Sequence, residues 1–327
     1  MPTHDASTAC ENAVVISNLE KRFGSFVAVD RLSLEVRRGE IFGFLGPNGA
    51  GKSTTIRMLC GILQPDGGTG SVAGLDINSQ TEEIKNNIGY MSQKFSLYED
   101  LTVQENLEFY AGIYRLDARL AEQRREWAIE MAGLRAQRHA LTSTLSGGWK
   151  QRLSLGCSIL HEPPIVFLDE PTSGVDPISR RRFWDLIYTL AGNGTTVFVT
   201  THYMDEAEYC DRLALIYRGQ MIALGTPEDL KTDATNGLLF EIRCRHILEA
   251  AERVKRQAGI TDVAVFGNVL HLSAASHDTA QGALAMLHED GDADAVLERV
   301  MPTLEDVFIS SIERYDHAHQ PVREATR

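Results

Sequence analysis

Residues 46–54 read Gly-Pro-Asn-Gly-Ala-Gly-Lys-Ser-Thr and fit the phosphate-binding pattern Gly, four residues, Gly, Lys and then Ser or Thr. The apolar run at residues 40–45 predicts a buried strand before this loop, and residues 55–60 continue as a helix without a breaker. A strand, a glycine loop and a helix are the context that the pattern requires, because backbone N–H groups and a helix N-terminus can then surround a phosphate. The alternative is a glycine turn with an incidental lysine.

The loop supplies most of the residues expected to bind a nucleotide. Lys52 would reach the β- and γ-phosphates, and the Ser53 hydroxyl would ligate Mg²⁺. The other loop residues expected to contact the nucleotide are Gly46, Pro47, Asn48, Gly49, Ala50, Gly51 and Thr54.

The length and charge of the chain limit the classes of function. Its 327 residues favour one large domain and a smaller one, and 43% hydrophobic with 24% charged residues is typical of a soluble globular protein. The formal net charge of −13 argues against unassisted binding to nucleic acid or anionic lipid, because both are polyanions. No apolar run of about 18 residues predicts a membrane span. The N-terminus carries Asp5 and Glu11 and lacks the apolar segment of a secretory signal.

The cysteines are five in number, widely scattered, and contain no Cys-x-x-Cys pair. This pattern indicates free thiols in a reducing cytosol and no metal site. The residues are Cys10, Cys60, Cys157, Cys210 and Cys244.

The N-terminal part of the chain predicts an antiparallel entry sheet. Residues 1–12 are expected to be disordered, and residues 14–19 and 27–36 read as its strands. Phe23 stands among charged residues and glycine, where its ring could stack on adenine; the alternative is an aromatic packed on the entry sheet. The glycine cluster at residues 65–74 predicts a turn.

A glutamine and a helical segment follow. Residues 88–91 read as a strand that leads to Gln93, whose amide oxygen could ligate Mg²⁺ or hold the attacking water; considered alone, Gln93 would be a surface residue. Residues 102–141 have the helical period, which indicates a helical subdomain at about residues 95–160. Ser146, Gly147 and Gly148 precede its last helix and form a second N-terminus suited to phosphate, unless Ser146 merely caps that helix.

Two strands end in residues suited to catalysis. Residues 165–168 form an apolar strand followed by Asp169, which would hold Mg²⁺ through water, and Glu170, which would polarise the attacking water. The alternative is a pair of solvated acids. The β-branched strand at residues 195–201 leads to His202, which is either a ligand-facing residue or a satisfied structural histidine.

The C-terminal part predicts a separate small domain. After a polar linker at residues 233–237, strands and helices alternate in the order βαββαβ, which suggests a ferredoxin-like domain. A further helix is expected from residue 303 to about 314, and residues 316–327 are expected to be disordered. The predicted domains are therefore residues 13–232 and 237–315.

In this order and spacing, the motifs resemble those of the ATP-binding cassette (ABC) ATPase family, over about residues 14–230. The resemblance implies an α/β P-loop NTPase fold with a RecA-like core, an antiparallel β subdomain and a helical subdomain. The matching motifs are the Walker A (46–53), the Q-loop (Gln93), the signature (145–151), the Walker B (165–170), the D-loop (173–176) and the switch histidine (His202).

What the resemblance implies is an ATP- and Mg²⁺-dependent switch. Two ATPase subunits, identical or paired, would meet head to tail, so that residues 146–148 of one contact the γ-phosphate held by Lys52 of the other. Gln151 and Asp176 are included among the nucleotide-binding residues on the same ground. Glu170 would act as general base, and His202 would contact the γ-phosphate.

The resemblance also implies a membrane partner. The helical subdomain and the loop after Gln93 would bind an integral membrane permease subunit on a separate chain, at the cytoplasmic face of the inner membrane. Residues 201–208 and 302–308 look like those of drug-exporter ATPases of the daunorubicin and multidrug type. The rivals are an importer ATPase, expected to carry a β-rich C-terminus, and a non-transport ABC protein acting on nucleic acid or ribosomes. The single signature and the negative charge count against the second rival.

Overall fold

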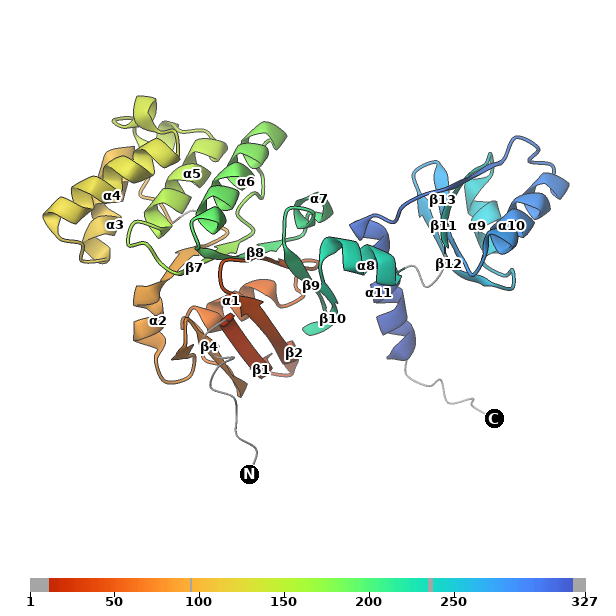
Figure 1. Cartoon of the computed structure of the whole chain (residues 1–327), viewed down its shortest axis with the longest axis horizontal. Helices are drawn as coiled ribbons and strands as arrows, with labels where there is room; N and C mark the ends of the chain where they lie inside the picture. The colour runs from red at the N-terminus through yellow and green to blue at the C-terminus, as the bar shows by residue number, and fades with distance from the viewer. Residues whose placement is uncertain (1–11, 95, 235–237, 320–327) are drawn as a thin grey trace. The chain divides into compact units, whose positions relative to one another are not determined.

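A parallel sheet forms the centre of the larger part of the protein. The computed structural model describes residues 12–94, 96–234 and 238–319, and it divides the chain into two compact units at residues 224 and 225 (Figure 1). The first unit contains a six-stranded sheet in which strands β3, β6, β7, β8 and β9 run parallel. In spatial order its strands are β10 (Gln220–Gly225), β9 (Arg212–Tyr217), β3 (Ile41–Leu45), β8 (Thr196–Thr201), β7 (Ile165–Asp169) and β6 (Ile88–Met91).

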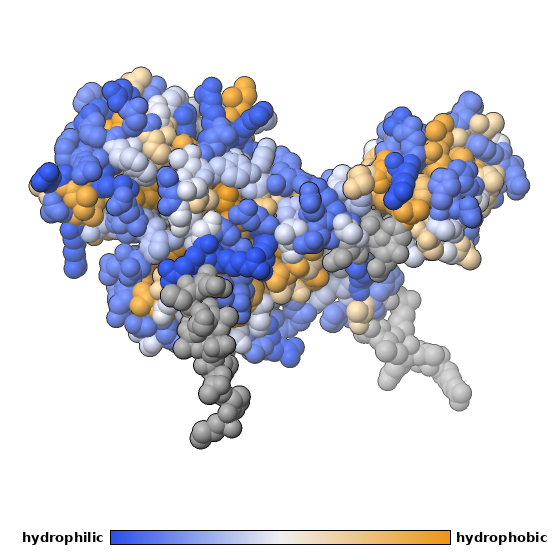
Figure 2. Space-filling view, in the orientation of Figure 1, coloured by the Kyte–Doolittle hydropathy of each residue, from blue (hydrophilic) through white to orange (hydrophobic). Residues whose placement is uncertain are grey.

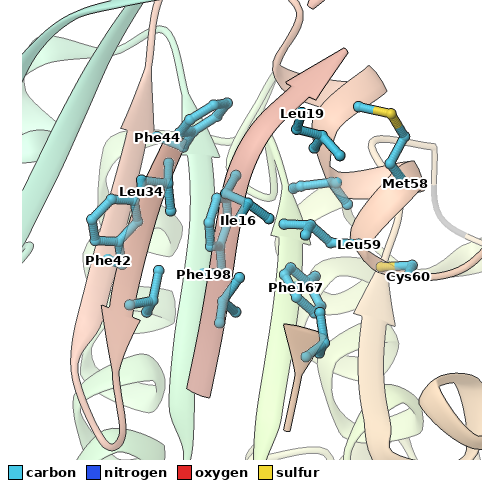
Figure 3. Close-up of a cluster of buried hydrophobic side chains, with 14 of the residues drawn as sticks. Ile16, Leu19, Leu34, Phe42, Phe44, Met58, Leu59, Cys60, Phe167 and Phe198 are labelled. Atoms are coloured by element: carbon cyan, nitrogen blue, oxygen red, sulfur yellow. The ribbon is translucent and has the colours of Figure 1, made fainter. Parts of the chain in front are cut away.

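The central strands β3, β7 and β8 are buried along their whole length, as expected for a parallel sheet covered on both faces. Because successive side chains of a strand alternate, Phe42, Phe44, Phe167 and Phe198 gather on one face. Figure 3 shows these rings beside Ile16 and Leu34 of the antiparallel sheet and Met58 and Leu59 of helix α1 (Lys52–Leu59). The other face packs against α6 (Pro177–Gly192) through Phe183 and Trp184.

The predicted entry sheet is present and larger than expected. Strands β1 (Asn12–Phe23) and β2 (Phe26–Arg37) pair antiparallel, as the sequence predicts. The prediction of a turn at residues 65–74 is wrong, because β4 (Gly67–Val72) pairs antiparallel with β1, and a short β5 (Leu75–Asp76) follows. The glycines serve a close approach here: a Cβ on Gly68, whose φ is +83°, would lie 2.3 Å from the Asn18 carbonyl oxygen.

The helical subdomain has its own hydrophobic core. Thr102 starts α3 (Val103–Ile113) with a capping box to Glu105, and Asp117 caps α4 (Ala118–Met131). Figure 1 shows α3, α4 and α5 together in one lobe, beside α6. The remaining helices of the first unit are α2 (Thr81–Asn87), α3 (Val103–Ile113), α4 (Ala118–Met131), α5 (Gly147–Ser158), α7 (Met204–Ala207) and two short 3₁₀ helices at Arg135–Gln137 and Thr142–Thr144.

The second unit follows the predicted order βαββαβ. Its antiparallel sheet has the strand order β12-β13-β11-β14 and packs one face against α9 and α10. The ferredoxin-like assignment stays a prediction. Helix α8 lies in this unit, where it packs against α11, whereas the sequence placed it in the first domain. The elements are α8 (Pro227–Ala234), β11 (Leu238–Arg243), α9 (Ile247–Val254), β12 (Ile260–Phe266), β13 (Val269–Ala274), α10 (His277–Glu289), β14 (Val296–Arg299) and α11 (Leu304–Ala318).

Two predictions of disorder need partial correction. Asn12 belongs to β1, and residues 316–318 continue α11. Residues 1–11, 235–237 and 320–327 lie outside the described residues. Within the part that the structure describes, no helix is both long and apolar enough for a membrane span. The face in Figure 2 is hydrophilic over most of its area, with hydrophobic residues in separate groups.

Candidate active site

The phosphate-binding loop lies between β3 and α1, as the sequence predicts. Two of its glycines, Gly49 and Gly51, have φ angles of +82° and +106°, which side chains rarely tolerate. A Cβ on Gly51 would lie 2.4 Å from the Ala28 carbonyl oxygen, and one on Gly46 would lie 2.3 Å from that of Ile216. The loop therefore has the backbone shape and the close packing that a phosphate cradle needs.

Lys52 is the cation of this loop and is only 4% exposed. Its Nζ donates to the carbonyl oxygens of Gly46 at 2.7 Å and Pro47 at 3.2 Å. The same Nζ lies 3.2 Å from Oε1 of Glu170. This ion pair offsets the cost of burying both charges, and it brings the loop lysine to the end of β7.

Asp169 and Glu170 are buried, with exposures of 2% and 7%, so the alternative of two solvated acids is wrong. The Ser53 hydroxyl donates to Asp169 Oδ1 at 3.0 Å, and the Thr200 hydroxyl donates to the same oxygen at 2.8 Å. Hydroxyl and carboxylate oxygens are the ligands that Mg²⁺ prefers. The pairing of Ser53 with Asp169 therefore fits the predicted Mg²⁺ site.

Glu170 is held in a strained position by its neighbours. Its φ is +48°, in the left-handed region, and its backbone N–H donates to the Thr200 hydroxyl at 2.9 Å. Its Oε2 accepts from Gln93 Nε2 at 3.1 Å and lies 3.2 Å from Nδ1 of His202. Strain of this kind persists only where the surroundings impose it, and it often marks active sites.

Gln93 and His202 therefore reach the same carboxylate. Gln93 is exposed, as expected for a surface residue, yet its side-chain amide donates to the Glu170 carboxylate. His202 Nδ1 makes no hydrogen bond among the described residues, and the side chain is 31% exposed. The role of His202 as a ligand-facing residue stays a prediction.

The signature residues gather at a different place, where α5 begins. Ser146 is exposed and occupies the N-cap position, but its side chain makes no capping hydrogen bond. Gly147 is exposed, and Gly148 packs so closely that its Cβ would lie 2.5 Å from Ser179 Oγ of α6. Figure 1 shows α5 beside α6, and α1 packs on the opposite face of the parallel sheet from α6.

Two other expected nucleotide ligands have local structural contacts. Gln151 is fully buried, and its Nε2 donates to the Pro171 carbonyl at 2.6 Å, which ties α5 to the segment after β7. Asp176 is exposed and caps α6 by accepting from the Ser179 N–H at 2.9 Å. This hydrogen bond lowers the pKa of the Asp176 carboxyl below its ordinary value.

Phe23 lies at the end of β1, opposite Phe26 of β2. It is 51% exposed, and its stacking on adenine stays a prediction. The Lys21 ammonium lies 5.8 Å from the centroid of the ring.

Thr200 was missed at the sequence level, although it contacts both acids of the site. Its hydroxyl donates to Asp169 and accepts from the Glu170 N–H. The sequence shows only a β-branched strand here, and the pair Thr200-Thr201 directly before His202 is the one signal that could have indicated it.

The thiols agree with the prediction of free cysteines. Cys60, Cys157, Cys210 and Cys244 are free, and Cys10 lies outside the described residues. Burial raises the pKa of the Cys60 thiol, and the nearby Asp169 raises it further. The described part of the chain holds no group of three His, Cys, Asp or Glu residues arranged for a metal ion.

Two family models match the first unit. The model described as "ABC transporter" matches residues 29–173, which include the phosphate loop, Gln93, the signature and both acids. A model for an AAA domain matches residues 150–204, from α5 to the segment after β8.

Curated relatives and solved structures extend this match. "Probable multidrug ABC transporter ATP-binding protein YbhF" of Escherichia coli is 51% identical over 70% of this chain and 40% of the relative, so the chain spans less than half of that protein. "Daunorubicin resistance ATP-binding protein DrrA3" of Streptomyces coeruleorubidus is 36% identical over 91% of this chain and 95% of its own length. The structure described as "Dimeric structure of a post-hydrolysis state of the ATP-binding cassette MJ0796 bound to ADP and Pi" covers 65% of this chain and 98% of its own, with 26% identity and a TM-score of 0.60.

Proposed function

Since this chain belongs to the ABC transporter family of ATP-binding proteins, we propose that it hydrolyses ATP to drive export of a small molecule through a separate membrane subunit. One observation carries the catalytic part of the proposal: Lys52, Gln93 and His202 all lie within 3.2 Å of the Glu170 carboxylate. Relatives named for multidrug and daunorubicin resistance support export. The site of action would be the cytoplasmic face of the inner membrane.

The geometry suggests how ATP would change the site. In this structure the Lys52 ammonium contacts loop carbonyls and Glu170. The phosphates of ATP would attract this cation, because they carry more negative charge than one carboxylate. Glu170 would then be free to accept a proton from the attacking water, with Gln93 and His202 beside it. Ser53 and Asp169 would hold Mg²⁺, which neutralises phosphate charge when bound.

The signature residues support a dimer as the active form. Ser146, Gly147 and Asp176 are exposed, and the Ser146 hydroxyl is not used for capping. We propose that these residues complete the ATP site of a second copy arranged head to tail. One solved relative is described as a dimer with ADP and Pi.

The importer alternative is less well supported. An importer ATPase is expected to carry a β-rich regulatory C-terminus, whereas the second unit contains helices α8 to α11 besides a four-stranded sheet. A non-transport role on nucleic acid is disfavoured by the net charge of −13.

The first experiment is a comparison of Glu170→Gln with the wild-type chain. The variant keeps the shape of the side chain but cannot accept a proton, so it should bind ATP, lose turnover and accumulate as a dimer. Glu83→Gln on exposed α2 makes the same change away from the site and should behave as the wild type. Lys52→Ala should lose ATP affinity. Wild-type turnover by Glu170→Gln would exclude the role given to Glu170.

The transport part needs a second measurement on the same variant. Tagged Glu170→Gln is isolated with ATP in mild detergent, and the proteins bound to it are identified by mass spectrometry. A polytopic membrane protein supports the proposal, and its kind distinguishes export from import. Ribosomal or DNA-bound partners would overturn the transport part and leave the ATPase chemistry standing.

A further inference from the structure

Arg180, in the first turn of α6, contacts three residues of the segment that follows β8. Its guanidinium carbon lies 4.2 Å from the centroid of the Tyr203 ring. Its Nη1 lies 3.3 Å from Asp205 Oδ2, and its Nε lies 3.4 Å from Glu206 Oε1. One side chain thus joins α6 to the start of α7, two segments that are separated by strand β8 in the sequence.

Glu206 explains why this position requires a cation. It is 0% exposed, and one of its oxygens accepts from the Thr201 hydroxyl at 2.7 Å. The other oxygen, Oε1, makes no hydrogen bond among the described residues and faces Arg180. A buried carboxylate needs a compensating charge, and the Arg180 side chain, 18% exposed, supplies it from α6.

Tyr203 connects this network to the site. Its ring contacts both the Arg180 guanidinium and the His202 ring, whose centroid is 4.2 Å away at an interplanar angle of 37°. Its backbone N–H donates to the Thr201 hydroxyl at 3.0 Å. His202 Nδ1 makes no hydrogen bond in the described structure and lies 3.2 Å from Glu170 Oε2. The ring contact with Tyr203 is therefore a second restraint on the orientation of the histidine, besides its approach to Glu170.

The contacts among Arg180, Tyr203 and Glu206 begin at the first turn of α6. The backbone N–H of Arg180 donates to the Asp176 carbonyl at 2.9 Å. Asp176 is the exposed cap of α6 and one of the residues proposed to face the second copy. A displacement of the first turn of α6 would therefore move Arg180, and with it Tyr203.

We propose that Arg180 is a positioning residue that orients His202 toward Glu170 through Tyr203 and Glu206. It links the side of the molecule that faces the second copy to the hydrolysis site of the same chain. The catalytic part rests on the proposed function, because His202 must act in hydrolysis for its orientation to matter. The predicted effect lies in turnover and not in ATP binding.

Arg180→Lys tests this in a double-mutant cycle with His202→Ala. Lysine keeps the charge near Glu206 but loses the planar group over Tyr203. We expect kcat to fall on the order of tenfold with an unchanged KM for ATP, since misplacing a reacting group by about 1 Å can cost up to about a hundredfold. In the His202→Ala background the same change should have less than about a twofold effect. An equal fall in both backgrounds, or a rise in KM, would overturn the proposal.

Matched variants separate positioning from general damage. Arg181→Lys makes the same change at the next, exposed position of α6 and should leave kcat unchanged. Tyr203→Phe keeps the ring and should retain activity, whereas Tyr203→Ala should reproduce the effect of Arg180→Lys. Activity retained in Tyr203→Ala would contradict the role of the ring.

A second measurement does not depend on hydrolysis. The ring resonances of His202 are followed by NMR in the ATP-free chain with ¹⁵N-labelled histidine and assigned by their loss in His202→Ala. Arg180→Lys should shift or broaden them, and Arg181→Lys should not. Unchanged resonances in Arg180→Lys would overturn the proposal even in an active enzyme. If the wild-type chain failed to hydrolyse ATP, the proposed function would fall, while the resonances would still decide whether Arg180 positions His202.

Discussion

Glu170 lies between a lysine, a glutamine and a histidine that come from three other segments of the chain. Its positive φ of +48° is a conformation that costs a non-glycine residue roughly 1–3 kcal/mol. The Lys52 ion pair and the hydrogen bond to Thr200 oppose this cost. The sequence predicts that the strand at residues 165–168 ends at two acids. It does not predict the strained φ of Glu170, because that strain arises from contacts with residues far away in the chain.

Gly51→Ala is a prediction at the residue scale. The φ of +106° and the 2.4 Å approach to the Ala28 carbonyl leave no room for a methyl group. We expect a loss of roughly 1–3 kcal/mol in the free energy of unfolding, together with weaker ATP binding. Chemical denaturation and a nucleotide titration measure both.

Gly112→Ala is the matched control for this change. Gly112 lies in α3 without a positive φ, and a Cβ there would meet nothing within 4 Å. The substitution should stabilise the protein by about 0.5–1 kcal/mol, because alanine loses less backbone entropy in a helix. Equal effects of the two substitutions would show that the loop conformation does not require glycine.

Among the elements, α5 and α6 meet at a contact that permits little substitution. The Cβ of an alanine at position 148 would lie 2.5 Å from Ser179 Oγ and 2.7 Å from Ser179 Cβ. Gly148 therefore serves the packing of two helices as well as any contact with a second copy. The sequence predicts both helices, but it cannot show that they touch at this pair.

Gly148→Ala should destabilise the first unit by roughly 1–3 kcal/mol through overpacking. Ser179→Gly removes the opposing atoms. Alone, this substitution should lower the free energy of unfolding by about 0.5–1 kcal/mol, because glycine destabilises a helix. In the Gly148→Ala background it should stabilise the protein instead. Denaturation of the four chains of this cycle measures the reversal of sign, and additive losses would contradict the proposed contact.

Helix α11 carries a carboxyl with a shifted pKa in the second unit. Burial, together with the hydrogen bond and charge of Asp262 on β12, raises the pKa of Glu313 from 4.5 to about 7, while Lys255 opposes the shift. Glu313 and Asp262 line a cavity together with Arg314 and His317. The helix and the sheet thus meet through two carboxyls that favour a shared proton.

The stability of the second unit should therefore fall as the pH rises. The pKa of Glu313 is higher in the folded state than in the unfolded state. Its contribution to the free energy of unfolding is therefore fully present below about pH 4.5 and is lost as the pH rises through about 7. Glu313→Gln imitates the protonated form and should flatten this dependence. Thermal unfolding from about pH 5 to about pH 8 tests it, and the same slope in the variant and the wild type would assign the effect to other groups.

At the scale of the whole molecule, the proposed ATP site belongs to one unit. Lys52, Gln93, Asp169, Glu170 and His202 all lie before residue 224, and the first unit has three hydrophobic cores of its own. The second unit has a separate core around Phe240, Leu270 and Leu272. Each unit therefore buries enough apolar surface to be expected to fold alone.

A chain that ends at residue 226 should keep the wild-type affinity for ATP. This end preserves β10 (Gln220–Gly225), the edge strand of the parallel sheet. Circular dichroism and a nucleotide titration of the shortened chain give the result. A folded fragment with lost affinity would show that the second unit contributes to binding.

The sequence by itself determined most elements of the ATPase unit, and its motifs predicted the residues of the ATP site. Strands β3, β7 and β8, helices α1, α5 and α6, and the predicted order of the second unit follow from apolar runs, helical periods and glycines. These signals are local, so they can be found without knowledge of the fold. A local signal also misled: the glycines of β4 predict a turn, because glycine favours turns unless a neighbouring strand pairs with it.

Only the tertiary structure decided which of these residues act on one another. It placed Lys52, Gln93 and His202 around Glu170, brought Thr200 to both acids, and set Arg180 over Tyr203. It also buried Gln151 against Pro171, where the family resemblance implied a nucleotide contact. Such pairings depend on how parallel strands and their helices align in space, and they join residues whose separation along the chain carries no signal of contact.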